Sequence, residues 1–249
     1  MLKAIYWNIR SIYSLLYVVF TNFITIVRLL KLTEALTIRP FKTFQWHDGF
    51  LYFIGALNDK KVFMKIDLFS GCQENEIIAH NILKPHMDRN LVPILGFERK
   101  GPSTIVIYEF INSFNQDVFS NHCDNKMLIE VLRIVETINN CGIIHRDLKE
   151  DNFLLAHDRS LKIIDFTFCA DLTGHERFCK PEPGSAFELG VNTFLGGAYR
   201  DSDSPWNDFH ALNLIFQKYQ VSIESVYQLT GRKNFHKLTS LRSEYSYRG

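Results

Sequence analysis

Residues 142–155 read GIIHRDLKEDNFLL, and residues 161–168 read LKIIDFTF. Apolar residues flank both stretches, yet Asp147, Lys149 and Asn152 stand together in the first, and Asp165 stands in the second. The plain alternative is a solvated surface loop. That alternative gives no reason for acids, cations and an amide to gather between apolar runs. The pattern therefore indicates a site that carries chemistry.

The composition limits the possible fold classes and partners of the chain. The chain has 249 residues, 46% of them hydrophobic, and a formal net charge of +1. This length and apolar content suit one folded domain, or one two-lobed domain, and exclude a disordered chain. The near balance of charge leaves no global basic field, so we expect no nucleic-acid partner.

The cysteine pattern favours a reducing compartment. Five cysteines, an odd number, stand at positions 72, 123, 141, 169 and 179, and no pair has the CxxC spacing. Such a set indicates free, mostly buried thiols rather than a disulfide framework or a zinc site. We therefore expect a cytoplasmic protein.

Residues 1–40 form an N-terminal segment of a different kind. Between Arg10 and Arg28 the sequence SIYSLLYVVFTNFITIV holds no charge, but its polar residues fall on one side of a helical projection. The segment therefore predicts an amphipathic helix. Three roles for residues 3–28 stay open: binding a membrane surface, at the inner face of the membrane; docking on the protein itself; or, least favoured, spanning the bilayer.

The rest of the chain changes from strands to helices. FKTFQW, FLYFIGAL and KKVFMKI are separated by Asp48-Gly49 and Asn58-Asp59, which predicts an antiparallel meander. A helix over ENEIIAHNILKPH and strands in LVPILGFER and STIVIYEFI complete a strand-rich half, residues 41–111. A long helix over NKMLIEVLRIVETINNCG, ending at Gly142, opens a helical half, residues 112–249.

These features together resemble the protein kinase superfamily. Residues 145–152 fill the pattern H-R-D-L-x-x-x-N at every specified position, and the resemblance extends over roughly residues 44–215. It implies an α+β, two-lobed protein-kinase-like fold with a shortened helical C-lobe, preceded here by the amphipathic helix. It also implies that the chain is a kinase that uses ATP and Mg²⁺.

The resemblance assigns roles to the residues of the two opening stretches. Asp147 would accept or orient the proton of the acceptor hydroxyl, and Lys149 would contact the phosphoryl group in transfer. Asn152 and Asp165 would bind the metal ions. Phosphoryl transfer asks a protein mainly for alignment and charge neutralisation, which such a set can supply.

Other positions follow from the same resemblance. Lys65 in VFMK would bind the α- and β-phosphates, and Glu76 would be its partner on the next helix, with Glu74 as the alternative. IYEFI, residues 107–111, resembles the hinge, where the backbone at Glu109 and Ile111 would meet adenine. Asp208 would bond the backbone of the catalytic loop from below.

Four departures from the family pattern are visible. The glycine-rich phosphate loop is absent, and only Gly49 and Gly55 lie near its place. The metal-binding triplet DFG is Asp165-Phe166-Thr167, no A-P-E triplet closes the activation segment, and about forty residues follow Asp208. These departures touch the platform for a protein substrate more than the chemical centre.

The motifs do not identify the molecule that accepts the phosphoryl group. Small bacterial kinases of lipopolysaccharide-core or other glycan sugars are similar in their reduced form, and a membrane-bound helix would suit a lipid-linked sugar. A sugar hydroxyl of such a glycan is therefore our first expectation. A reduced Ser/Thr protein kinase is the alternative, since Lys149 resembles that branch. A pseudokinase that acts as an interaction module is a third reading, opposed by the joint presence of Lys65, Asp147, Asn152 and Asp165.

Overall fold

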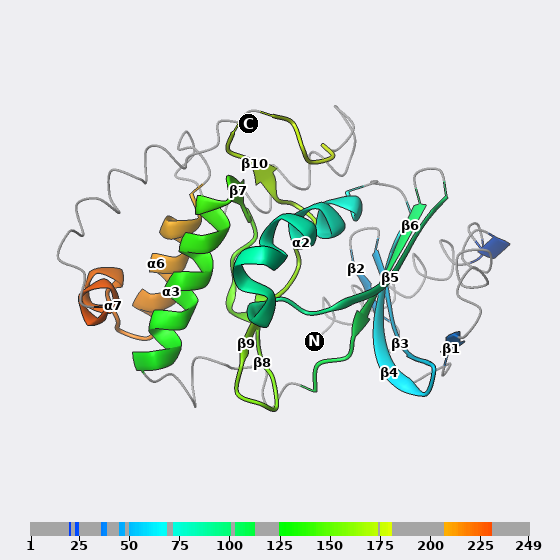
Figure 1. The fold of residues 1–249 in the computed structure, drawn as a ribbon, viewed down its shortest axis with the longest axis horizontal. Helices are drawn as coiled ribbons and strands as arrows, with labels where there is room; N and C mark the ends of the chain where they lie inside the picture. Colours follow the sequence, from blue (N-terminus) through cyan, green and yellow to red (C-terminus); the bar gives the residue numbers. More distant parts are fainter. Residues whose placement is uncertain are drawn as a thin grey trace, which may run out of the picture. The chain divides into compact units, whose positions relative to one another are not determined.

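The computed structural model describes residues 20, 23–24, 36–38, 45–47, 50–68, 72–100, 103–112, 125–173, 175–180 and 207–230 (Figure 1). The chain divides into two compact units. The first comprises Met1–Gln73 and Pro93–Phe110, and the second comprises Glu74–Val92 and Ile111–Gly249. The division of 41–111 and 112–249 expected from the sequence stays a prediction.

The first unit is built on an antiparallel sheet. Its strands are β1 (Leu36–Ile38), β2 (Gln45–His47), β3 (Phe50–Leu57), β4 (Lys60–Asp67), β5 (Ile94–Lys100) and β6 (Ser103–Glu109). The order is β1-β3-β4-β6-β5, and β2 also pairs with β3. Leu51, Val62, Met64, Ile66 and Ile107 are among the buried side chains that form its core.

The turn between β3 and β4 confirms one sequence prediction. Asn58 and Asp59 have φ of 48° and 62°. Two successive left-handed residues make the tight hairpin turn whose twist matches paired strands, and Asn and Asp tolerate that conformation. The turn sets the register that places Lys65 of β4 opposite Tyr52 of β3.

Strand β1 differs from what the sequence predicts. Residues 36–38 lie in the segment 1–40 that is expected to be helical, but they form a strand that pairs with Leu57, Ala56 and Gly55 of β3. Three residues are too few for a periodic signal. The neighbouring edge of β3 decides their conformation, because it offers backbone hydrogen bonds that an isolated LTI segment lacks.

Helix α2 (Glu74–Met87) belongs to the second unit. Ala79, Leu83 and Met87 are spaced four residues apart and so lie along one helix face. All three are part of the core cluster of the second unit. Glu74 and Glu76 lie in the first turn, where acidic side chains interact favourably with the helix dipole.

Helix α3 (Asn125–Asn140) is the centre of the second unit. Its core face confirms the periodicity read from the sequence: Leu128, Val131, Leu132, Ile134, Val135 and Ile138 are all buried. The helix ends at Asn140, just before the predicted stop signal Gly142, which has φ +73° and donates its N–H to the carbonyl of Asn139 at 2.9 Å. A residue with a Cβ is strained in that conformation.

Short elements around α3 position the loops. They are β7 (Ile143–Ile144), the 3₁₀ turns η1 (Asp88–Asn90) and η2 (Glu150–Asn152), β8 (Phe153–Leu155), β9 (Leu161–Ile163), β10 (Ala170–Asp171), α6 (Asp208–Lys218) and α7 (Ile223–Leu229). Strand β8 pairs with β9, and β7 pairs with β10. Residues 145–152 lie between β7 and β8 in the chain, and residues 164–169 lie between β9 and β10.

The predicted N-terminal amphipathic helix lies almost wholly outside the described residues. Of residues 3–28 only Phe20, Phe23 and Ile24 are described, and they are helical and exposed. None of the helices that the structure describes is both long enough and apolar enough to cross a bilayer.

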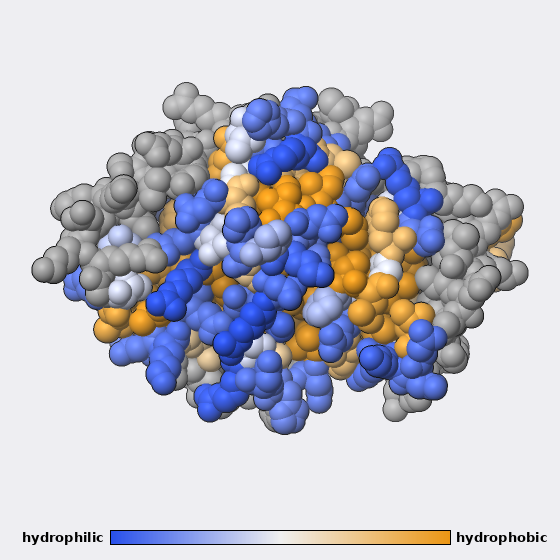
Figure 2. Space-filling view, viewed as in Figure 1, coloured by the Kyte–Doolittle hydropathy of each residue, from blue (hydrophilic) through white to orange (hydrophobic). Residues whose placement is uncertain are grey.

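Hydrophilic residues cover much of the described surface in the view of Figure 2, with hydrophobic residues between them. In the second unit the exposed large hydrophobic side chains among the described residues are Leu214 on α6 and Leu229 on α7. Single exposed leucines of this kind are normal on a globular surface.

Candidate active site

Asp147 is held by two neighbours in its own loop. Its Oδ2 lies 2.7 Å from Lys149 Nζ and 3.3 Å from Asn152 Nδ2. Its side chain is 8% exposed, whereas that of Lys149 is 51% exposed. No described residue donates to Oδ1. These two contacts orient the carboxylate, and its other oxygen is the one that would meet an acceptor hydroxyl.

Asn152 has a geometry that suits a metal ligand. Its Nδ2 donates to the carbonyl of Asp147 at 2.7 Å, so the amide orientation is set by a bond that only nitrogen can make. No described residue donates to its side-chain oxygen. An amide oxygen fixed in this way is a suitable ligand for a hard cation such as Mg²⁺.

Asp165 is the other expected metal ligand. It has φ +69°, and Arg146 in the catalytic loop has φ +68°. Non-glycine residues adopt this region rarely, and such residues are enriched at functional sites. Among the described residues, no three His, Cys, Asp or Glu side chains gather as a self-contained metal site. A magnesium ion held by Asn152 and Asp165 fits this finding, because magnesium usually takes few protein ligands and completes its shell with phosphates and water.

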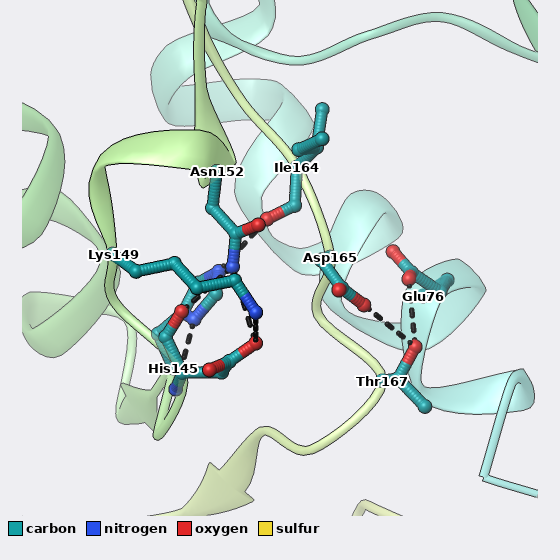
Figure 3. A network of polar contacts seen from close by, with 8 residues as sticks. Glu76, His145, Lys149, Asn152, Ile164, Asp165 and Thr167 are labelled. Carbon is teal, nitrogen blue, oxygen red and sulfur yellow. Dashed lines mark hydrogen bonds and ion pairs between the residues drawn. The ribbon is translucent and has the colours of Figure 1, made fainter. Parts of the chain in front are cut away.

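His145 connects the two stretches. Its Nδ1 accepts the N–H of Asp147 at 3.3 Å, so Nε2 carries the proton and donates it to the carbonyl of Ile164 at 3.0 Å (Figure 3). Its ring is buried against Phe166, with centroids 4.8 Å apart. His145 therefore ties the catalytic loop to the stretch that leads into Asp165.

Asp208 supports the catalytic loop, as predicted. Its Oδ2 accepts the N–H of His145 at 2.7 Å and its Oδ1 accepts that of Arg146 at 3.1 Å, while Asn139 Nδ2 donates to Oδ2 at 3.2 Å. Burial raises the pKa of Asp208, and hydrogen bonds from the two backbone N–H groups oppose that rise. The carboxylate fixes the backbone on which Asp147 stands.

Glu76 contacts the Asp165 segment directly. Its Oε2 accepts the N–H of Phe166 at 3.1 Å, and its Oε1 lies 2.9 Å from Thr167 Oγ1. Thr167 Oγ1 is also 3.0 Å from Asp165 Oδ1. Figure 3 shows Glu76 and Asp165 meeting at Thr167. The structure thus brings Glu76 and Asp165 together through a residue that the sequence analysis treated only as a lost glycine.

Lys65 lies in the first unit, on β4. It is buried, with 4% of its surface exposed, and its Nζ lies 4.8 Å from the centre of the Phe50 ring. A lysine is almost never buried on a strand without an interacting group, so its burial separates Lys65 from an ordinary solvated lysine. Its expected pairing with Glu76 joins the two units and stays a prediction.

The expected hinge lies where the chain leaves the first unit, after Phe110. The N–H of Glu109 donates to the carbonyl of Pro93 at 2.9 Å, and the N–H of Phe110 donates to that of Lys61 at 3.3 Å. No described residue accepts the N–H of Ile111. The roles of Glu109 and Ile111 toward adenine remain predictions.

Comparison with known proteins decides the family. The family model described as "Protein kinase domain" matches residues 58–187, which is more than half of the chain. The chain belongs to the protein kinase family. It is 28% identical over 142 residues to serine/threonine-protein kinase PAK 1 of Mus musculus, covering 54% of this chain and 26% of that protein.

One more curated relative and one solved structure are similar to this chain. The chain is 29% identical over 153 residues to cysteine-rich receptor-like protein kinase 44 of Arabidopsis thaliana, covering 54% of this chain and 40% of that protein. Its fold is similar to that of the Cydia pomonella granulovirus kinase PK-1, with 15% identity, a TM-score of 0.47 and 59% of each chain covered. The chain therefore spans between a quarter and two fifths of the length of these two curated relatives.

Membership of the family establishes an α+β fold with a β-sheet lobe and a helical lobe. The match to the kinase domain implies a phosphotransferase that would use ATP and Mg²⁺. Asn75 and Thr167 also belong to the site, and neither was expected there from the sequence. The signal that could have indicated Thr167 is a hydroxyl side chain two residues after Asp165, where the family has glycine.

Proposed function

We propose that this kinase transfers the γ-phosphoryl group of ATP to a serine or threonine hydroxyl of a protein, with Asp147 as the proton acceptor. The observation that carries the proposal is the contact of 2.7 Å between Lys149 Nζ and Asp147 Oδ2. This lysine resembles the loop lysine of the Ser/Thr branch. The similarity of the chain to serine/threonine-protein kinase PAK 1 supports the same class of acceptor.

The chain's own residues account for the transfer. Asp147 Oδ1 meets the acceptor hydroxyl and takes its proton as the oxygen forms a bond to the γ-phosphorus. The bond from that phosphorus to the bridging oxygen breaks, and ADP leaves. Lys149 neutralises charge beside the carboxylate. The binding of the α- and β-phosphates by Lys65 of the first unit remains an expectation from the family resemblance. Bound through Asn152 and Asp165, Mg²⁺ supplies neutralisation of phosphate charge.

A sugar of a membrane-associated glycan, such as lipopolysaccharide core, is the second candidate acceptor. Its support in the sequence was the amphipathic segment of residues 3–28, nearly all of which lies outside the described residues. The missing A-P-E triplet also favours it, because a reduced activation segment offers less platform for a peptide. Because so little of residues 3–28 is described, the glycan sugar stays the alternative acceptor and a protein hydroxyl comes first.

One labelling experiment separates the two acceptors. The purified protein is incubated with γ-labelled ATP, Mg²⁺ and an extract of its source cells, and protein, lipid-glycan and small-molecule fractions are counted. We expect label in phosphoserine or phosphothreonine of the protein fraction. Asp147→Asn should lower that label by roughly 10²–10⁴-fold, the usual contribution of a positioned acid or base.

The Asp147→Asn variant must show the same circular dichroism spectrum and melting midpoint as the natural protein, so that loss of fold is excluded. Aspartate-dependent label in the lipid-glycan fraction alone would overturn the protein acceptor in favour of the glycan. Equal label with aspartate and asparagine at position 147 would contradict the role assigned to this residue.

A further inference from the structure

Thr167 places a hydroxyl where the family has a glycine. Its side chain is fully buried, at 0% exposure, and its Oγ1 lies 2.9 Å from Glu76 Oε1 and 3.0 Å from Asp165 Oδ1 (Figure 3). A glycine at this position has no side chain to join the two carboxylates. The contact is therefore a feature of this chain's own sequence.

The backbone that carries this hydroxyl is fixed to α2. Asn75 Nδ2 donates to the carbonyl of Thr167 at 2.9 Å, and the N–H of Phe166 donates to Glu76 Oε2 at 3.1 Å. Asn75 also donates to the carbonyl of Cys179 at 3.0 Å and accepts its N–H at 2.7 Å. Two consecutive residues of α2 thus hold two separate parts of the segment that follows Asp165.

A hydroxyl carries one proton, so Thr167 donates to one carboxylate at a time. The other carboxylate then faces a lone pair of the same oxygen. This repulsion is relieved when the charge of that carboxylate is neutralised. Asp165 is the carboxylate whose charge a magnesium ion would neutralise, which leaves the Thr167 proton for Glu76.

We propose that Thr167 is a positioning residue whose hydroxyl couples Asp165 to Glu76, so that magnesium binding at Asp165 and the ordering of α2 strengthen one another. The inference rests on the proposed site, in which Asp165 binds Mg²⁺. Coupling of this kind is reciprocal, so it is measurable from either side, through metal affinity or through the stability of α2.

The first measurement is the Mg²⁺ concentration needed for half-maximal binding of a non-hydrolysable ATP analogue. Titration calorimetry measures this binding. Thr167→Val keeps the shape and removes the hydroxyl. We expect it to raise this concentration on the order of tenfold, the effect of losing one hydrogen bond to a charged group. Thr167→Ser restores the hydroxyl and should stay within about twofold of the natural protein.

The matched control is Thr104→Val. Thr104 on β6 is also fully buried, and its hydroxyl has no hydrogen-bond partner in the described part of the chain. Removing that hydroxyl should leave metal binding unchanged and the fold intact, because no hydrogen bond is lost. The control separates the effect of the Thr167 hydroxyl from that of any buried Thr→Val exchange.

The second measurement is amide hydrogen exchange over Glu74–Met87, with and without Mg²⁺ and the analogue. We expect the ligands to slow exchange in the natural protein and in Thr167→Ser, and to slow it several-fold less in Thr167→Val. If Thr167→Val does not fold, Thr167→Gly, which carries the family's residue, takes its place with the same expected results.

Both measurements work without phosphoryl transfer, so they do not depend on the identity of the acceptor. Magnesium-dependent binding that Thr167→Val leaves unchanged would overturn the coupling alone. A Thr167→Ser protein as impaired as Thr167→Val would overturn it as well, since the hydroxyl would then be irrelevant. Nucleotide binding with no magnesium dependence in the natural protein would overturn the proposed metal site and the coupling together.

Discussion

Asp171 and Arg177 form a partly buried ion pair six residues beyond Asp165. The Asp171 side chain is 5% exposed, and it accepts hydrogen bonds from Arg177 and from the N–H of Thr173 at 2.7 Å. Arg177 also donates to the carbonyl of Gly142 at 2.9 Å. Burial alone would raise the pKa of Asp171, but the hydrogen bonds from Arg177 and Thr173 outweigh it and hold the pKa well below its ordinary value.

We predict that Arg177→Ala lowers the free energy of unfolding by about 2 kcal/mol at pH 7, because it leaves a buried carboxylate without its cation. The folded-state pKa of Asp171 is depressed, so the pair's contribution is present above the unfolded pKa, near 4, and is lost as the pH falls below it. Urea unfolding between pH 7 and pH 3 should therefore show a penalty that is constant down to about pH 5 and then shrinks.

Lys180→Ala is the matched control for this pair. Lys180 contacts Glu176 at 2.9 Å, in the same segment, but both side chains are mostly exposed, at 61% and 76%. Solvent screens such a pair, so its removal should leave the unfolding free energy unchanged within error. A penalty for Arg177→Ala no larger than this control, or one that persists unchanged at pH 3, would argue against the burial of the Asp171 charge.

At the scale of elements, the end of α3 depends on one glycine. Gly142 has φ +73°, and a Cβ there would lie 2.5 Å from Thr173 Cγ2 and 3.0 Å from an Arg177 side-chain nitrogen. The added methyl therefore meets both backbone strain and a collision with the segment that contains Asp171. The helix stop is thus coupled to packing as well as to local conformation.

We predict that Gly142→Ala costs about 2–4 kcal/mol of unfolding free energy, from the left-handed conformation and from overpacking. Denaturant titration measures it. Gly96→Ala on β5 serves as a comparison, since its Cβ would meet only the Ile107 side chain, with Cδ1 nearest at 3.3 Å. Equal costs for the two variants would show that the conformation of Gly142 is not the deciding factor.

At the scale of the whole molecule, ligand binding should raise thermal stability. ATP and Mg²⁺ bind the folded chain and not the unfolded one, so at one hundred times the dissociation constant they stabilise it by about 2.7 kcal/mol. For a chain of this size we predict an increase of roughly 5–10 °C in the melting midpoint. Differential scanning fluorimetry measures it directly.

Asp165→Asn tests whether this increase depends on the proposed metal site. We expect the variant to melt near the natural protein without ligand and to gain much less from ATP and Mg²⁺ together. ATP with a chelator in place of Mg²⁺ should give a similarly small gain for both proteins. A full increase in Asp165→Asn would place the metal on other residues.

Pattern and spacing along the chain were enough to predict the main elements and the catalytic loop. The apolar period of α3, the glycine at its end and the Asn58-Asp59 turn are local features, and each is decided by residues close together in sequence. The H-R-D-L-x-x-x-N stretch is also local, so the assignment to kinases needed no tertiary information. Strand β1 was missed because its partner, β3, supplies its hydrogen bonds.

Contacts between distant residues required the folded chain. Asn75 and Thr167 are separated by 92 positions and Asn139 and Asp208 by 69, so no periodicity links them. The first pair is made where α2 packs against the Thr167 loop, and the second where α3 packs against the start of α6. Both contacts bury polar groups that must then be satisfied. Local sequence thus determined the family and its candidate catalytic residues. Tertiary packing decided that Thr167 joins Asp165 to Glu76, because a buried hydroxyl must find its partners wherever the fold brings them.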